Sequence, residues 1–236
     1  MKQLFNLIKN NLDKPRLTTV DNESSTIWIY DAIGADMFGG VDAKEVAQQI
    51  AGMTGDTIHV RINSPGGDVF SGRAIAAALK ASKAKIIGYV DGLAASAATT
   101  ILMAADEIIM AEGSFLMIHN SMTFVYGNKD EFLEIAELLE QIDGAIANDY
   151  MQRTGKDSDT VKKWMDAETW FSAVDAVANG FADSVAGSDG AKNAATWNLS
   201  AYNNAPKIEF DNSNDDAQAL REKLKKRLSL LERCPA

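Results

Sequence analysis

Short runs rich in β-branched and aromatic residues alternate with amphipathic segments between residues 26 and 185, and this alternation restricts the fold most. The strand-like runs are Thr26–Tyr30, Thr57–Ile62, Lys85–Val90, Glu107–Met110 and Phe115–Ile118. The segments with helical spacing are Asp42 to about Met53, Val69–Lys80, Ser96–Ala105 and Lys129 to about Arg153. Strands that alternate with helices are typical of βαβ crossovers. The sequence therefore predicts an α/β fold with a largely parallel sheet.

Composition divides the 236 residues into four parts. Residues 1–25 are polar and predict a flexible leader, and residues 26–186 carry the strand and helix pattern of one folded domain. Residues 187–216 are rich in Gly, Ala, Asn, Ser and Asp, which favours a disordered linker. Residues 217–236 have a leucine stripe at helical spacing among basic residues. They predict an amphipathic basic helix that docks or self-associates, or a solvated extension.

Charge and cysteine content limit the partners and the compartment. The net charge of -10 argues against a general nucleic-acid binder or a protein of anionic membrane surfaces. The single cysteine, Cys234, fits a reducing compartment. We find no secretory signal in residues 1–17 and no apolar run of the roughly 18 residues that span a bilayer. A soluble cytoplasmic protein is therefore expected, and no His, Cys and carboxylate cluster has the spacing of metal ligands.

The chain has two histidines, so candidates for a catalytic base are few. His59 lies inside Thr57–Ile62, where alternation predicts a partly exposed strand residue. His119 directly follows the apolar run Phe115–Ile118. The end of a buried strand is where α/β proteins place functional groups. His119 is thus either a functional imidazole or a hydrogen-bonded core histidine.

Two further segments contain groups suited to acyl transfer. Ser96 follows a predicted break at Gly92 and begins a helix of small residues, where free N–H groups stabilise an oxyanion. An ordinary N-cap serine is the alternative. The turn Asn63–Gly67 exposes backbone amides without Cβ interference, as an oxyanion hole, a phosphate cradle or a plain tight turn would. It matches neither the Walker pattern nor GxGxxG.

Three segments together carry a family resemblance. Ile62–Gly67, Gly92–Ala97 and Met117–His119 occur in the order and approximate spacing of the ClpP-like (Clp-type) serine peptidases. The resemblance covers roughly Thr26 to Val185 and makes residues 26–186 a peptidase domain. It implies a ClpP/crotonase-like fold with repeated βαβ units, a mostly parallel sheet and a protruding "handle" helix, here Lys129 to about Arg153.

The same resemblance implies roles for individual residues. Ser96 would be the nucleophile and His119 the general base, with an oxyanion hole from the backbone N–H groups of Gly67, Asp68 and Ala97. The family carries an aspartate before a Phe-Leu-Ser-Ala-like segment, and Trp170-Phe171-Ser172-Ala173 is the match here. Counting back in that register reaches Glu168, which we expect to orient the imidazole, with Asp166 as the reserve. No metal or organic cofactor is implied.

The resemblance also suggests partners. The handle implies a homo-oligomer, as a heptameric ring or double ring. Trp28–Gly34, Asp68–Phe70 and Glu168–Trp170 look like the phage and prophage branch of prohead (head maturation) proteases. That branch implies an ATP-independent endopeptidase that cleaves scaffold or capsid precursors in the host cytoplasm or inside the prohead. The basic C-terminal helix would then dock the enzyme or be cleaved away.

Several other functions remain open. The chain could be a ClpP-type proteolytic subunit that works with an AAA+ unfoldase, or a non-catalytic capsid-assembly or scaffold protein on the same fold. A crotonase-type acyl-CoA enzyme would use a backbone oxyanion hole without Ser96 and His119. A Ser/Lys signal-peptide peptidase is similar around Ser96, but the Met117–His119 match favours histidine as the base. The α/β-hydrolase pattern GxSxG is absent around Ser96.

Overall fold

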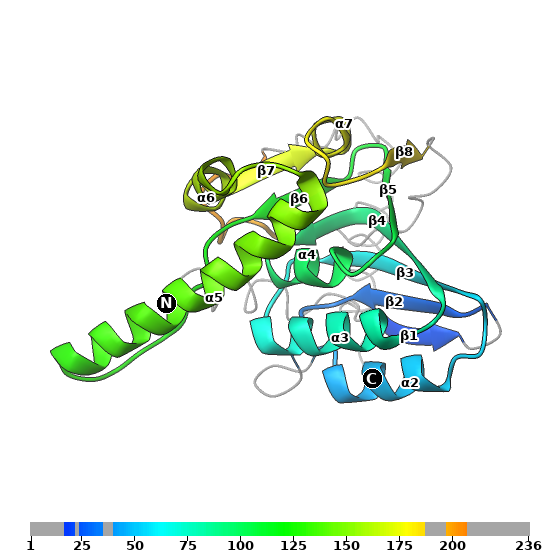
Figure 1. Ribbon diagram of the computed structural model, residues 1–236, viewed down its shortest axis with the longest axis horizontal. Helices are drawn as coiled ribbons and strands as arrows, with labels where there is room; N and C mark the ends of the chain where they lie inside the picture. Colours follow the sequence, from blue (N-terminus) through cyan, green and yellow to red (C-terminus); the bar gives the residue numbers. More distant parts are fainter. Residues whose placement is uncertain (1–16, 22–23, 35–39, 187–196, 207–236) are drawn as a thin grey trace, which may run out of the picture. The chain divides into compact units, whose positions relative to one another are not determined.

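One eight-stranded sheet organises the computed structural model, which describes residues 17–21, 24–34, 40–186 and 197–206 (Figure 1). The strand order is β1-β2-β3-β4-β5-β8, while β6 pairs with β4 and β7. The bounds are β1 Leu17–Asp21, β2 Thr26–Tyr30, β3 Thr57–Ser64, β4 Lys85–Ala95, β5 Glu107–Ala111, β6 Phe115–Ile118, β7 Thr169–Ser172 and β8 Ser184–Ala186. Only the β1–β2 and β6–β7 pairs are antiparallel. The predicted α/β fold with a mostly parallel sheet is confirmed.

Six helices among the described residues complete the elements. They are α2 Ala43–Gly52, α3 Val69–Ala81, α4 Ala97–Leu102, α5 Lys129–Thr154, α6 Ser158–Asp166 and α7 Ala173–Ala178. The long helix α5 begins with a capping box between Asn128 and Glu131 and ends at Gly155, whose φ is 67°. Its first half extends away from the sheet (Figure 1). This helix corresponds to the predicted handle, with nearly the same bounds.

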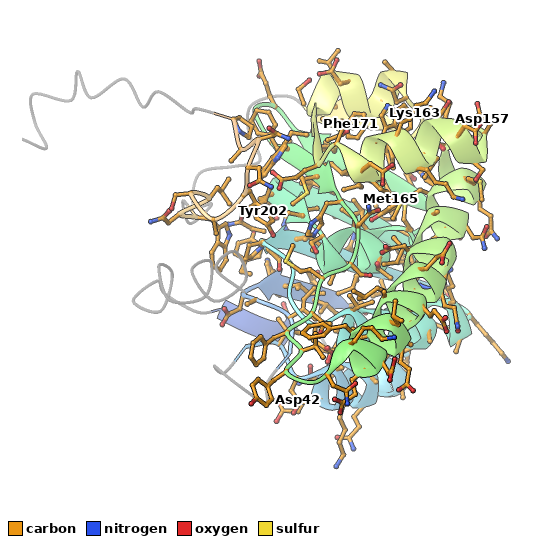
Figure 2. All side chains as sticks on the ribbon, turned by 90° about the vertical axis from the view of Figure 1, so that its left-hand side faces the viewer. Asp42, Asp157, Lys163, Met165, Phe171 and Tyr202 are labelled. Carbon is orange, nitrogen blue, oxygen red and sulfur yellow. The ribbon has the colours of Figure 1, made fainter. Side chains whose placement is uncertain are left out.

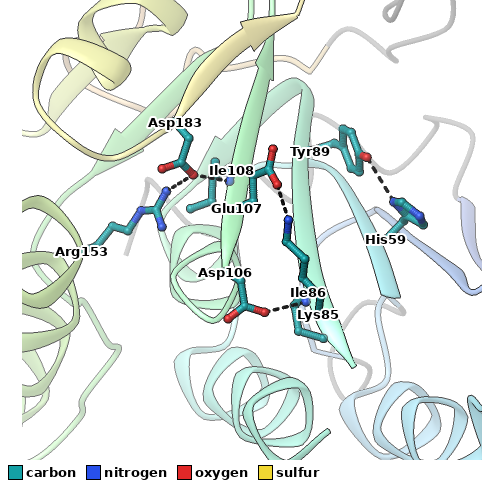
Figure 3. A network of polar contacts seen from close by, with 9 residues as sticks. All are labelled: His59, Lys85, Ile86, Tyr89, Asp106, Glu107, Ile108, Arg153 and Asp183. Atoms are coloured by element: carbon teal, nitrogen blue, oxygen red, sulfur yellow. Dashed lines mark hydrogen bonds and ion pairs between the residues drawn. The ribbon is translucent and has the colours of Figure 1, made fainter. Parts of the chain in front are cut away.

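The core lies between the sheet and its helices. In β3 the burial alternates, with Ile58, Val60 and Ile62 buried and the side chains between them partly exposed. Burial of each such aliphatic side chain stabilises the fold by about 1.5–3 kcal/mol. The alternation places the half-buried His59 on the other face, where its Nδ1 lies 3.1 Å from the hydroxyl of Tyr89 (Figure 3). His59 is thus the partly exposed strand residue that the sequence predicts.

Strand β4 differs from its prediction in a way that shapes the functional region. The sequence predicts that this strand ends at Val90 and that Gly92 breaks it, but β4 continues to Ala95. The strand changes partner along its length: residues 87–90 pair with β5 and residues 93–95 pair with β6. Its second half is therefore held by new ladder hydrogen bonds, and extended backbone runs directly into Ser96.

Two segments that composition assigns to irregular chain contribute to the fold. Strand β1, inside the predicted leader 1–25, pairs with β2 from Leu17↔Tyr30 to Asp21↔Thr26. In the predicted linker 187–216, Ala201 and Tyr202 are buried. Composition alone could not predict these two contributions. The first depends on backbone pairing with β2 and the second on burial of one aromatic side chain. The predicted helix 217–236 lies outside the described residues.

Polar ties hold α5 against the sheet (Figure 3). The carboxylate of Asp183 accepts a 2.6 Å hydrogen bond from the N–H of Ile108 in β5 and pairs with the guanidinium of Arg153 in α5. Arg153 also donates through Nε to the carbonyl of Phe181. One carboxylate thus connects the segment before β8 to both a strand and a helix.

Candidate active site

Ser96 and His119 come from the ends of neighbouring parallel strands. Strands β4 and β6 pair in the register Ala95↔Met117, so the residues that follow them leave the sheet at the same edge. The N–H of Ser96 donates to the carbonyl of Met117 at 2.9 Å. The Ser96 Oγ lies 2.7 Å from His119 Nε2, which is hydrogen-bonding distance. The structure therefore brings together the nucleophile and the base that the sequence predicts.

The backbone of Ser96 has an unusual conformation, with φ 54° and ψ -127°. A non-glycine residue in such a region costs on the order of 1–3 kcal/mol and persists only where its surroundings hold it. The side chain makes no capping hydrogen bond to α4. Ser96 thus occupies the N-cap position of α4 without the side-chain hydrogen bond of an ordinary capping serine. Its hydroxyl is directed to His119 instead.

The glycine turn after β3 packs directly on this serine. Gly66 has φ 90°, and a Cβ placed there would lie 2.5 Å from the carbonyl oxygen of Ala95 and 2.7 Å from the Cβ of Ser96. At Gly67, with φ 150°, a Cβ would lie 2.1 Å from the carbonyl oxygen of Ile33. Only glycine fits such close approaches. The two glycines therefore allow the backbone of this turn to lie directly beside Ser96.

The three backbone N–H groups expected to form the oxyanion hole differ in whether they are already hydrogen-bonded. The N–H of Asp68 donates to the carbonyl of Ile33 at 2.8 Å, and the Asp68 carboxylate caps α3 by accepting from Ser71. Within the described residues, the N–H groups of Gly67 and Ala97 have no hydrogen-bond acceptor. In this conformation, two of the three donors are open to a ligand and the Asp68 N–H is not.

The surroundings of His119 favour its neutral imidazole. Burial lowers the pKa of His119 because desolvation disfavours the imidazolium, while the carboxylates of Glu168 and Asp143 act in the opposite direction. Asp143 is itself fixed by a 2.6 Å hydrogen bond from the N–H of Ser121. A neutral imidazole can accept the proton of a hydroxyl, as a general base must.

Glu168 is a buried carboxylate, 7% exposed, and its hydrogen bonds join it to groups other than the His119 imidazole. It accepts from the backbone N–H groups of Asn203 at 3.1 Å and Asn204 at 2.8 Å. It also accepts from the Asn203 side chain and from the indole of Trp170, both at 3.3 Å. None of the hydrogen bonds among the described residues joins Glu168 to His119. Its influence on the imidazole is electrostatic.

Asp166, the reserve candidate, lies at the end of α6 and accepts a hydrogen bond of 2.8 Å from the side chain of Asn120. Asn120 follows His119 directly in the chain. The contact ties α6 to the loop after β6, and no hydrogen bond in the described part of the chain joins Asp166 to the imidazole. In this conformation, therefore, neither expected carboxylate is hydrogen-bonded to His119 Nδ1.

Sequence reasoning missed a fourth component, the segment Trp197–Ala205. Its Tyr202, labelled in Figure 2, donates a 2.6 Å hydrogen bond to the carbonyl of Pro65. Trp197 donates to the carbonyl of Asn63 at 3.1 Å. The segment shares an apolar cluster with Leu93, Ala95 and Met117. The available signal was two aromatic residues in an otherwise polar stretch.

The described residues contain no group of three or more His, Cys, Asp or Glu side chains that could hold a metal ion. No helix among them is long and apolar enough to cross a membrane.

Comparison with known proteins identifies relatives. The Clp protease family profile matches residues 23–189. The chain is 34% identical over 129 residues to the ATP-dependent Clp protease proteolytic subunit of Pleurastrum terricola, and 36% identical over 132 residues to that of Aethionema cordifolium. These alignments cover 54% and 55% of this chain and 66% and 67% of the relatives, so the chain spans about two thirds of their length.

A solved structure supports the fold. A ClpP1 mutant from Listeria monocytogenes aligns with a TM-score of 0.62 and 24% identity, over 70% of this chain and 93% of that one. This similarity agrees with the expected ClpP/crotonase-like fold, and the relatives' description as proteolytic subunits agrees with the expected serine-type peptidase. The profile match covers well over half of the sequence, and the chain belongs to the Clp protease family.

Proposed function

We propose that the protein is a serine endopeptidase with Ser96 as nucleophile and His119 as general base. The 2.7 Å contact between Ser96 Oγ and His119 Nε2 is the observation that supports this most strongly. Among the described residues the hydrogen-bond partner of the Ser96 side chain is histidine, which favours this pair over a Ser/Lys peptidase. The strained backbone of Ser96 and the glycine turn beside it fit an acyl-transfer site.

The proposed mechanism follows from these positions. His119 Nε2 accepts the hydroxyl proton of Ser96 as Oγ attacks the carbonyl carbon of a peptide bond. The N–H groups of Gly67 and Ala97 donate to the oxyanion of the tetrahedral intermediate, and Asp68 would join them only if its bond to Ile33 opens. The imidazolium then gives its proton to the leaving amine. Water, activated by the same imidazole, hydrolyses the acyl-enzyme.

Glu168 is the proposed acidic member of the site. Its negative charge favours the imidazolium form of His119, which is the form that develops during attack. It acts across space, because its hydrogen bonds go to Asn203, Asn204 and Trp170. Asp166 remains the reserve, since its hydrogen-bond partner Asn120 directly follows His119 in the chain.

The relatives bear on the biological setting. They are described as proteolytic subunits of an ATP-dependent Clp protease. This favours a subunit that receives unfolded protein from an AAA+ partner, in place of the ATP-independent prohead protease that the sequence suggested first. A head-maturation role is the second candidate. It is favoured by Glu168 where the resemblance expects aspartate, and by the resemblance of Trp28–Gly34 to that branch.

The handle supports self-association. Phe124 and Tyr126, before α5, are 63% and 92% exposed, and Phe132, Leu133 and Leu138 on α5 are also exposed. A concentration of large apolar side chains on one projecting element marks an interaction surface. We assign it to a second copy of this chain, as the resemblance to ring-forming peptidases implies.

Activity-based labelling tests the proposed chemistry. A fluorophosphonate should modify Ser96 in the full chain, located by peptide mass spectrometry, and the Ser96→Ala variant should stay unmodified. Absence of labelling together with capsid binding would support a non-catalytic assembly protein. Acyl-CoA turnover that persists in Ser96→Ala would support a crotonase-type enzyme. Co-expression with an AAA+ unfoldase or with a capsid precursor would separate the two peptidase settings.

A further inference from the structure

One side chain touches both halves of the proposed catalytic site from outside the family-matched core. Tyr202 lies in the segment Trp197–Ala205, beyond the last strand of the sheet. It is buried, 8% exposed, and packs in the apolar cluster with Leu93, Ala95 and Met117. Figure 2 labels it on the ribbon. Neither the family profile, which ends at residue 189, nor the mechanism above assigns Tyr202 a role.

The first contact of Tyr202 is with the imidazole. Its ring meets the His119 ring edge-to-face, with centroids 5.9 Å apart and planes at 89°. It also meets the Trp170 ring edge-to-face, with centroids 5.5 Å apart and planes at 76°. Such perpendicular aromatic pairs are favourable and directional. The phenol ring therefore lies where it can limit rotation of the imidazole and shield it from water.

The second contact is with the glycine turn. The Tyr202 hydroxyl donates to the carbonyl of Pro65, at 2.6 Å. Pro65 immediately precedes Gly66, which packs on Ser96, and Gly67, whose N–H has no hydrogen-bond acceptor among the described residues. One rigid side chain thus links the turn that would bind the oxyanion to the base that would activate the nucleophile.

Glu168 holds this side chain in place. The backbone N–H groups that it accepts belong to Asn203 and Asn204, the two residues that follow Tyr202. Glu168 itself has φ 48°, a conformation that a non-glycine residue keeps only where contacts hold it. The buried carboxylate is therefore fixed in a geometry that anchors the segment immediately after the phenol ring.

We infer that Tyr202 is a positioning residue of this peptidase: it orients His119 and the Pro65–Gly67 turn toward Ser96, and Glu168 contributes through it. The inference rests on the proposed function. It extends the site to residues 197–205 and gives the buried glutamate a second task besides its electrostatic one. Tyr202 touches neither the reacting atoms nor, by this account, the substrate.

The test measures the rate of fluorophosphonate labelling of Ser96 across pH in the full chain. Tyr202→Phe keeps the ring and loses the Pro65 bond, so the pH midpoint should stay unchanged and the rate fall only about threefold. Tyr202→Ala frees and hydrates the imidazole, so the rate should fall at least about tenfold. Its midpoint should rise toward the ordinary histidine pKa of about 6.5. Tyr30→Phe is the matched control because it removes a tyrosine hydroxyl that donates to Asp91. No hydrogen bond or ring contact among the described residues joins Tyr30 to Ser96 or His119.

Labelling rate and melting temperature together distinguish a positioning role of Tyr202 from a role in stability alone. A Tyr202→Ala variant that melts lower but labels at the wild-type rate and midpoint would overturn the inference. If the alanine variant does not fold, Tyr202→Leu keeps apolar volume without the aromatic contact. It should still lose rate, and a wild-type rate in that variant would be equally decisive against positioning.

A double variant tests the contribution of Glu168. If part of its effect passes through Tyr202, Glu168→Gln should slow labelling by a smaller factor in the Tyr202→Ala background than in the wild type, because only its electrostatic effect on His119 is left to lose. Fully multiplied losses would mean that Glu168 acts on His119 through its charge alone and would overturn that part. Failure of wild-type Ser96 to label at all would instead count against the proposed function. The two failures are therefore distinguishable.

Discussion

The Ser96 hydroxyl and the His119 imidazole are hydrogen-bonded at 2.7 Å although 23 positions separate them in the chain. Their proximity follows from the sheet, because β4 extends to Ala95 and pairs in parallel with β6. Because β4 and β6 end at the same edge of the sheet, Ser96 and His119 lie next to each other. The relationship depends on the second half of β4, since a strand ending at Val90 would not reach β6.

The close packing of Gly66 on Ser96 predicts that an added methyl group at this position will slow labelling. Gly66→Ala would drive a Cβ into the carbonyl of Ala95 and the side chain of Ser96, so we expect loss of at least about 100-fold in labelling rate. Gly113→Ala is the matched control, because its φ of 78° is similarly left-handed but nothing lies within 4 Å of the added Cβ. It should cost stability of about 1 kcal/mol by backbone strain and leave the rate unchanged. Equal rates in the two variants would contradict the close packing of the turn.

The rate of Ser96 labelling should fall as the pH is lowered through the pKa of His119. Activity requires neutral His119, and burial lowers its pKa, so the acid limb of the labelling rate should have its midpoint below about 6.5. Asp143→Asn removes a carboxylate that raises this pKa while keeping an acceptor for Ser121. Its midpoint should therefore move further down. A wild-type midpoint above the ordinary histidine value would show that the imidazolium is favoured instead.

The tie between α5 and the sheet predicts a stability difference. Asp183→Ala removes the acceptor of the Ile108 N–H and the carboxylate that pairs with Arg153, whose guanidinium keeps only its bond to the carbonyl of Phe181. This loss should cost about 1–3 kcal/mol in the free energy of unfolding. Asp130→Ala removes the partner of Lys129 in a pair whose side chains are 82% and 78% exposed. That control should change stability by less than about 1 kcal/mol. Urea titration followed by circular dichroism measures both, and equal effects would argue against the tie.

The handle predicts dependence of assembly on its exposed aromatics. Replacing Phe124 and Tyr126 by serine removes apolar surface that we assign to a second copy, so sedimentation velocity should show smaller species than the wild type. Val174→Ser, at a position 69% exposed on α7, provides the control and should sediment as the wild type does. Unchanged assembly in the aromatic variant would place the interface elsewhere.

Most of the sheet could be predicted because burial alternates regularly, as in β3, where each second residue is an aliphatic core side chain. The extension of β4 could not, because Gly92 reads locally as a break and its pairing with β6 is a long-range property. The Ser96–His119 pair followed from matched motifs. The hydrogen bonds of Glu168 did not, since they depend on Asn203 and Asn204 in a stretch whose composition favours disorder.

The hydroxyl of Ser114 offers a matched control for the central experiment. It is buried, and its Oγ has no hydrogen-bond partner among the described residues. Replacement by alanine removes an unsatisfied polar group, so Ser114→Ala should fold at least as stably as the wild type. A serine-to-alanine change as such is therefore not expected to impair the protein.

The most direct measurement is hydrolysis of an unfolded protein substrate by wild type, Ser96→Ala and Ser114→Ala at equal concentration, with peptide products identified by mass spectrometry. The account predicts cleavage by the wild type and Ser114→Ala. It predicts none by Ser96→Ala, which should keep the same sedimentation coefficient and melting temperature within the error of measurement. Undiminished cleavage by Ser96→Ala would contradict the assignment of the Ser96–His119 pair as the catalytic centre.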